Sequence, residues 1–134
     1  MRSKLDVVLK RYKLESHRDS TVSALAQGVR KLLDIAMAVV SEPRILLLDE
    51  PTSGISVEEK FDFMDIVMGA LKEDGVTVLF VEHDMEIVAR YVSRVLAFYQ
   101  GEIIADMPPK KALADEKVQE FVIGKEHHKK RNRT

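Results

Sequence analysis

The sequence predicts an α/β domain with a mainly parallel sheet flanked by helices. Two short apolar segments, residues 45–48 and 76–81, are separated by a helical pattern, and acidic residues follow each of them. Alternation of strand, helix and strand is typical of parallel sheets, because the connecting helix crosses over one face of the sheet. A third observation is that 46% of the 134 residues are hydrophobic, which suffices for the core of one domain or of a piece of a larger one.

The composition excludes several classes of protein. A net charge of −1 with this many aliphatic residues excludes a disordered chain. The chain has no cysteine, which excludes a disulfide scaffold, a thiolate metal site and a cysteine nucleophile, and which suits a reducing cytoplasm. Its apolar runs are far shorter than the roughly 20 residues that cross a bilayer. The charged N-terminus has no apolar core of the kind found in a secretory leader.

Residues 1–43 are predicted to form a helical part. The apolar side chains Leu5, Val8, Leu9 and Tyr12 repeat at helical spacing within residues 3–15. A polar connection over residues 16–20 leads to an alanine-rich segment, 24–40, which is long enough for a buried helix. This helix should end before Pro43, because the residue preceding a proline is pushed out of the helical region.

Residues 44–124 are predicted to form the α/β core. The apolar run at 45–48 suits a strand buried on both faces, as in a parallel sheet. After a turn at 52–54, Ser56 and Glu59 have the spacing of a capping box. The helix that follows should bury Phe61, Met64, Val67, Met68 and Leu71.

The remaining elements follow the turn at Asp74-Gly75. Residues 76–81 read as the second strand, and Asp84 should cap a short helix that ends near residue 91. Residues 95–99 and 102–105 are predicted to form a hairpin around Gln100-Gly101. Pro108-Pro109 should open a last helix to about residue 122, with Gly124 as its stop. Residues 125–134 are a basic tail, with five basic residues against Glu126, and are expected to be disordered.

Acidic residues at the end of the first strand are the strongest chemical signal. Ligands of open α/β sheets bind beyond the carboxyl ends of the strands. Asp49 would there hold Mg²⁺ on the phosphates of a nucleotide, and Glu50 would orient or deprotonate an attacking water. His83, at the end of the second strand, would face the same crevice. The alternative is that these are incidental residues at which the chain leaves the sheet into solvent.

A glycine lies near the start of the alanine-rich helix, within Leu25-Ala26-Gln27-Gly28-Val29. Glycine allows backbone N–H groups to approach a phosphate, and the helix dipole favours an anion at this end. Taken alone, the pattern also fits a helix that begins beside a flexible glycine.

Taken in order, these segments resemble the ATP-binding cassette (ABC) ATPases over roughly residues 5–124. The resemblance rests on L-A-Q-G-V, then S-E-P-R-I-L-L-L-D-E-P-T-S-G, then V-L-F-V-E-H-D-M. It implies the C-terminal part of a P-loop NTPase fold, preceded by part of the helical signature subdomain. The phrases at 81–85 and 118–124 are similar to the subfamily that energises branched-chain amino acid importers.

The resemblance implies a role for each motif, with ATP and Mg²⁺ as cofactors. Asp49 would be the Mg²⁺-associated acid, through a water, Glu50 the catalytic base and His83 the switch histidine. The signature that contacts the γ-phosphate of ATP held by the opposite subunit would comprise Leu25, Ala26, Gln27, Gly28 and Val29. The loop that crosses the dimer interface would comprise Ser53, Gly54, Ile55 and Ser56. The implied partners are a second ATPase subunit and the membrane subunits of a transporter, on the cytoplasmic face of the cell membrane.

The sequence departs from the family in four places. It contains no G-x-x-x-x-G-K-[ST], the loop that cradles phosphates, and its only Gly-Lys is Gly124-Lys125. Ala26 stands where the family has serine, Val29 where it has glutamine, and Ser56 where it has aspartate or asparagine. We therefore expect this chain alone to be inactive and to need the missing N-terminal half-cassette. Without that half it should expose apolar sheet edges and self-associate or bind a partner chain.

Two other hypotheses remain at this point. The chain could be a non-enzymatic half-cassette or regulatory dimerisation module, which the missing phosphate loop favours. It could also belong to the ABC ATPases that act on DNA, with the basic tail as the contact. Those proteins join their lobes by long coiled coils, and residues 1–20 hold at most two turns of heptad spacing. No nucleic-acid partner is therefore expected.

Overall fold

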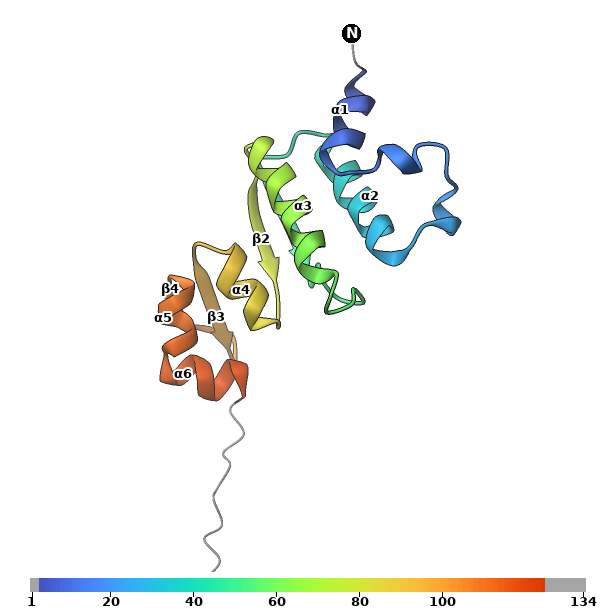
Figure 1. Ribbon diagram of the computed structural model, residues 1–134. Coiled ribbons are helices and arrows are strands. Elements are labelled where there is room, and N and C mark those ends of the chain that lie inside the picture. The colour runs from blue at the N-terminus through green and yellow to red at the C-terminus, as the bar shows by residue number, and fades with distance from the viewer. Residues whose placement is uncertain (1–2, 125–134) are drawn as a thin grey trace, which may run out of the picture. The chain divides into compact units, whose positions relative to one another are not determined.

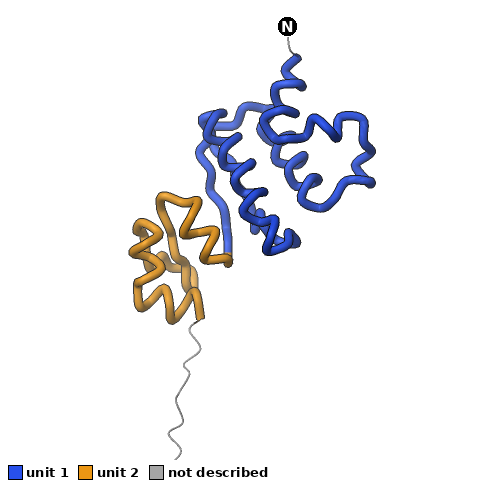
Figure 2. Tube along the Cα trace, in the orientation of Figure 1, with its two compact units in different colours: residues 1–82 blue, residues 83–134 orange. Residues whose placement is uncertain are grey.

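The computed structural model describes residues 3–124, which divide into two compact units between Glu82 and His83 (Figure 2). The first unit contains α1 (Lys4–Arg11), α2 (Gln27–Val39), β1 (Ile45–Asp49), α3 (Lys60–Glu73) and β2 (Thr77–Val81), with 3₁₀ turns at Glu15–His17 and Val22–Ala24 (Figure 1). The second contains α4 (Met85–Tyr91), β3 (Val95–Tyr99), β4 (Glu102–Met107), α5 (Pro109–Ala114), α6 (Glu116–Val118) and a π-helical turn at Gln119–Ile123. This order of elements agrees with the prediction. The predicted basic tail, 125–134, lies outside the described residues.

Helix α1 is shorter than predicted and begins with a capping box. The Ser3 hydroxyl accepts a hydrogen bond from the Asp6 amide, and the Asp6 carboxylate accepts one from the Ser3 amide. The helix ends at Arg11 because Lys13 adopts a left-handed backbone with φ of 58°. Beyond it, Tyr12 and Leu14 turn into the core and are buried.

Helix α2 begins three residues later than predicted. Residues 22–24 form a 3₁₀ turn, and Leu25 and Ala26 are extended before the first helical residue, Gln27. The helix predicted to be buried is buried on one face only, which carries Leu32, Ile35, Ala36 and Val39, whereas Met37 is 64% exposed. The helix ends before Glu42, whose φ is 56°, and Pro43.

Strands β1 and β2 pair in parallel, as predicted, with Leu47 opposite Leu79. The prediction that β1 is buried on both faces is wrong for the described residues. Leu46 is 9% exposed, whereas its neighbours Ile45 and Leu47 are 63% and 70% exposed. Leu79 and Val81 of β2 are also more than half exposed. Because successive side chains point to opposite faces of a sheet, one face of this strand pair is covered and the other is bare and apolar.

Helix α3 begins at Lys60 without a side-chain cap, so the capping role predicted for Ser56 is wrong. The Ser56 hydroxyl donates to the Glu59 carboxylate at 2.9 Å, while the Ser56 carbonyl accepts from the amides of Glu59 and Lys60. A backbone turn therefore precedes the helix. Met64, Val67 and Leu71 are buried as predicted, and Phe63 is buried where Phe61 was expected.

The second unit is a hairpin with short helices. Asp84 caps α4, as predicted, by accepting hydrogen bonds from the amides of Glu86 and Ile87. The hairpin is antiparallel, and β4 extends two residues further than predicted. The single helix predicted from Pro108 is broken, because the Asp115 side chain caps a new start by accepting from the Val118 amide at 3.0 Å. Gly124 ends the last turn with φ of 67°, in agreement with the prediction.

Candidate functional site

Asp49 and Glu50 lie at the carboxyl end of β1, as the sequence predicts. Asp49 is the last residue of the strand and pairs with Val81 of β2. The Glu50 amide donates to the Val81 carbonyl at 2.9 Å, which continues the parallel ladder by one bond. The Asp49 side chain is exposed and that of Glu50 is half-buried. Glu50 has a φ of 45°, in the left-handed region that residues with a Cβ rarely adopt.

The loop at residues 50–56, here called the acid loop, is held by its own backbone and by both neighbouring segments. The Ser53 amide donates to the Glu50 carbonyl, and the Ile55 amide donates to the Thr52 carbonyl. Pro51 and Thr52 are buried. The acid loop is therefore an ordered part of the first unit that carries exposed residues at Ser53, Gly54 and Ser56.

The first turn of α2 contacts the acid loop. A Cβ placed on Gly54 would lie 2.2 Å from the Gln27 Nε2 atom, and Gly54 has a φ of 77°. The backbone angle favours glycine, and a Cβ at this position would displace the flexible end of the Gln27 side chain. The structure thus brings residues 25–29 and 53–56 together at the contact between Gln27 and Gly54.

The start of α2 has no side chain that caps it. Ala26 is the N-cap residue, and its methyl group offers no acceptor to the amides of the first turn. Leu25 is buried, whereas Ala26 and Gln27 are exposed. Gly28 lies inside the helix and has open space where a Cβ would be. This end of the helix can offer backbone donors to an anion but no hydroxyl.

His83 belongs to the second unit, of which it is the first residue. It follows Glu82 and immediately precedes Asp84, the cap of α4, and its side chain is exposed. The first unit thus assembles Asp49, Glu50 and the residues of the two other predicted segments.

The residues that anchor the acid loop were missed by the sequence analysis. Lys31 donates from Nζ to the Pro51 carbonyl at 3.1 Å, and Thr52 donates from Oγ1 to Glu82 Oε2 at 3.2 Å. Lys31 lies in the helix α2. A lysine in a helix is usually on the solvated face, so the sequence gave no sign that Lys31 contacts the acid loop. Thr52 is a polar residue in the turn that the sequence predicts, and its type gave a signal for a side-chain hydrogen bond there.

The donor set around Asp49 is suited to a metal that arrives with its own ligands. Among residues 3–124, no group of three or more histidine, cysteine, aspartate or glutamate side chains could hold a metal ion. Mg²⁺ is commonly bound by one or two carboxylates together with substrate phosphates. A single exposed carboxylate at a strand end fits that mode and does not fit a cage made by the protein alone.

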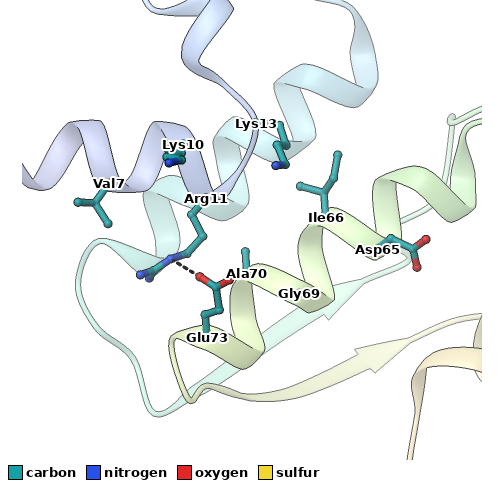
Figure 3. Close-up of a pocket in the computed structure, with 9 residues that line it drawn as sticks. All are labelled: Val7, Lys10, Arg11, Lys13, Asp65, Ile66, Gly69, Ala70 and Glu73. Atoms are coloured by element: carbon teal, nitrogen blue, oxygen red, sulfur yellow. Dashed lines mark ion pairs between the residues drawn. The ribbon is translucent and has the colours of Figure 1, made fainter.

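A groove of about 370 Å³ lies elsewhere in the first unit, between α1 and α3 (Figure 3). Lys10, Arg11 and Lys13 line one side and Asp65 and Glu73 the other. An ion pair between Arg11 Nε and Glu73 Oε2, 3.1 Å apart, bridges the two helices. None of the predicted site residues lines this groove, so it is separate from the candidate site.

Comparison with known proteins gives a consistent result. The ABC transporter family model matches residues 1–53. The chain is 33% identical over 118 residues to the energy-coupling factor transporter ATP-binding protein EcfA3 of Clostridium perfringens. The matched segment is 88% of this chain and 41% of that protein. It is 35% identical over 115 residues to a putative ABC transporter ATP-binding protein of onion yellows phytoplasma, with 86% of this chain and 19% of that protein covered.

Solved structures show the same likeness in three dimensions. The ADP conformation of an ATP-binding cassette of an ABC transporter matches with a TM-score of 0.78 and 32% identity, over 88% of this chain and 48% of that one. The structure of cbiO1 from Clostridium perfringens, part of the ABC transporter complex cbiONQ, matches with a TM-score of 0.77 and 33% identity, over 85% of this chain and 45% of that one.

The chain therefore spans less than half the length of these relatives. None of the helices in the described residues is both long enough and apolar enough to cross a membrane. The sequence and the structure are therefore similar to the ATPase domains of ABC transporters, and the chain has part of their P-loop NTPase fold.

Proposed function

We propose that this chain is the C-terminal portion of the ATP-binding subunit of an ABC transporter, which couples MgATP binding and hydrolysis at a subunit interface to solute import. The observation that carries the proposal is the pair of acids at the end of β1, with the Glu50 amide fixed to the Val81 carbonyl at 2.9 Å. An acid pair at the carboxyl end of a parallel strand suits phosphoryl transfer, in which catalysis is mostly positioning and electrostatic stabilisation.

The candidate residues would have the following roles. Asp49 would hold Mg²⁺ through a water, and that ion would neutralise charge on the phosphates when MgATP is bound. Glu50, half-buried beside it, would accept a proton from the attacking water. His83 would donate to the γ-phosphate. The uncapped first turn of α2, with residues 25–29, and residues 53–56 would face ATP held by the opposite subunit.

The sequence lacks the phosphate-binding loop that such a site needs. No sequence of the form G-x-x-x-x-G-K-[ST] is present, so no lysine and glycine loop of this chain can cradle the phosphates. Ala26 has no hydroxyl to donate, and a hydrogen bond to a charged group contributes roughly 1.5–3 kcal/mol. A polypeptide with the phosphate loop is therefore proposed as the partner that completes the site, together with a second ATPase subunit and the membrane subunits.

The bare face of the β1–β2 sheet supports this partner. Four apolar side chains on that face, Ile45, Leu47, Leu79 and Val81, are between 55% and 70% exposed. Parallel sheets are found almost only with both faces covered. We expect the same partner that supplies the phosphate loop to cover this face.

Equilibrium binding of MgATP tests the proposal. The purified chain should show no binding up to millimolar ATP. It should bind when a separate polypeptide that carries the phosphate loop of a full-length relative is added, with Glu50→Gln as the companion that blocks turnover. Micromolar binding by the chain alone would contradict the need for a partner. No binding with the added polypeptide, despite a complex on gel filtration, would refute the proposed site.

A second candidate function is a non-enzymatic half-cassette or regulatory dimerisation module. Ala26 favours it, because the α2 N-terminus lacks both a cap and a hydroxyl donor. The same experiment distinguishes the two. A complex that binds MgATP but shows no turnover with Glu50 intact would support the regulatory module.

We propose branched-chain amino acids as the solute that the transporter imports. The phrases at 81–85 and 118–124 support an importer of branched-chain amino acids, whereas EcfA3 carries the name of energy-coupling factor transporters. Capture of the chain, with its added polypeptide, by membrane subunits of each type decides between them. Retention by the branched-chain amino acid permease alone would support the first, and retention by the energy-coupling factor subunits alone would exclude it.

A further inference from the structure

The acid loop is anchored at two points by one face of α2. Lys31 donates from Nζ to the Pro51 carbonyl at 3.1 Å, in a partly buried position. Gln27 lies four residues earlier and its side chain is packed against Gly54. Residues separated by four positions lie on the same face of a helix, so the two contacts act together.

A third anchor holds the loop from the side of β2. The Thr52 hydroxyl donates to the Glu82 carboxylate at 3.2 Å, and Thr52 is only 8% exposed. Glu82 follows directly after Val81, whose carbonyl accepts the Glu50 amide. Glu50 is therefore connected to the end of β2 both by its own amide and through Thr52.

These anchors surround a backbone that is strained. Glu50 has a φ of 45°, a conformation that persists only when the surrounding structure over-determines it. The bonds from Lys31 and Thr52 meet at consecutive residues, Pro51 and Thr52, immediately after Glu50. A charged ammonium donating to a carbonyl is a stronger bond than one between neutral groups.

We propose that Lys31 and Gln27 are positioning residues that lock the acid loop onto the first turns of α2. Glu50 and the surface formed by residues 25–29 and 53–56 then keep one geometry. For its catalytic consequence this inference rests on the proposed function, but the lock itself is tested without nucleotide. The contact between Gln27 and Gly54 is made by the end of the Gln27 side chain, so it needs a long side chain at position 27.

Amide hydrogen exchange of the full chain, read residue by residue by NMR, tests the lock. Lys31→Met keeps the length of the side chain and removes the donor, Lys31→Arg keeps a donor, and Lys10→Met is the control on α1. We expect the Ser53 and Ile55 amides to exchange at least tenfold faster in Lys31→Met and within twofold of the unmodified chain in the other two. Unchanged exchange in a Lys31→Met variant with native helix content would overturn the role of Lys31.

The contact between Gln27 and Gly54 is tested by a double-mutant cycle on the same amides. Gly54→Ala must displace the Gln27 side chain, and Gln27→Ala removes it, so the two changes damage one contact. The increase in exchange for the double variant should be smaller than the product of the two single increases. A full product would overturn the role of Gln27. This cycle also decides the inference if Lys31→Met does not fold.

Turnover by the chain with its added phosphate-loop polypeptide gives an independent result. Lys31→Met should lower kcat at least tenfold with KM within twofold, and Lys31→Arg should restore kcat. An equal loss for Lys31→Arg would overturn a positioning role. Absence of turnover in the unmodified complex would refute the proposed function, whereas the exchange experiments would still decide whether the lock exists.

Discussion

The left-handed backbone at Glu50 gives a quantitative prediction. For an L-residue with a Cβ this region costs roughly 1–2 kcal/mol, which glycine does not incur. Glycine instead loses roughly 0.5–1 kcal/mol more conformational entropy on folding. Glu50→Gly and Glu50→Ala both remove the carboxylate and its contacts, so their difference isolates the backbone at φ of 45°. The glycine variant should be more stable to unfolding than the alanine variant by about 0.5–1 kcal/mol.

Urea unfolding followed by the helical circular dichroism signal measures this difference. The same pair of substitutions at Asp34, an exposed acid in the middle of α2, is the matched control. There the order should reverse, with glycine less stable by about 1 kcal/mol, because Gly is a poor helix former. If the alanine variant at Glu50 is as stable as the glycine variant while the control reverses, the backbone at Glu50 is not strained. Both Glu50 variants should abolish turnover in the assembled site, which would locate the strain at a functional residue.

Three further predictions concern stability. The buried Tyr12 hydroxyl has no hydrogen-bond partner among residues 3–124, so Tyr12→Phe should raise the free energy of unfolding by about 1 kcal/mol in urea titrations. Burial raises the pKa of Tyr12 above its ordinary value of 10.0. The stability of the fold that depends on the neutral phenol is therefore complete below pH 10.0 and is lost as the pH rises through the raised pKa. Tyr12→Phe should remove this alkaline loss of stability. The hydrogen bonds from Arg94 lower the pKa of Asp106, so stability gained from this pair is present above the ordinary value of 3.8 and lost as the pH falls through the lowered pKa; Asp106→Asn should flatten that acid limb in thermal melts. Leu71→Ala should cost about 2–5 kcal/mol because Leu71 is fully buried, whereas Leu47→Ala, at 70% exposure, should change the same urea midpoint little.

Most elements of the fold were predictable because apolar periodicity and turn residues agree along the chain. The parallel pairing of β1 and β2, the Asp84 cap and the hairpin at Gln100-Gly101 are all confirmed. The errors are at boundaries. The left-handed backbone at Lys13 shortens α1, although lysine gives no signal for such a turn. Asp115 divides the last predicted helix, and it could have been recognised as a capping residue.

The location of Asp49 and Glu50 at the end of β1 could be predicted from the sequence, whereas the contacts of the acid loop could not. The spacing of Asp49 and Glu50 after an apolar run sufficed to locate them at the end of β1. The bond from Lys31 to Pro51 depends on the distance between α2 and the loop, which is set by tertiary packing. Burial on one face of β1 was also beyond the sequence, because a run of leucines is the same whether one or both faces are covered.

The exposed face of the β1–β2 sheet and the lack of a phosphate loop in the sequence have a common explanation under the proposed function. The sheet leaves Leu47 and Leu79, which pair across β1 and β2, exposed on a bare face. The acids at the end of that sheet have no phosphate loop in this sequence to work with. In α/β folds both faces of a parallel sheet are covered, and ligands bind beyond the carboxyl ends of its strands. Under the proposed function, one added polypeptide would both cover this face and supply the phosphate loop. Burial of Leu47 and Leu79 and gain of nucleotide binding should then occur at the same concentration of that polypeptide. Separate midpoints for the two would refute a common cause.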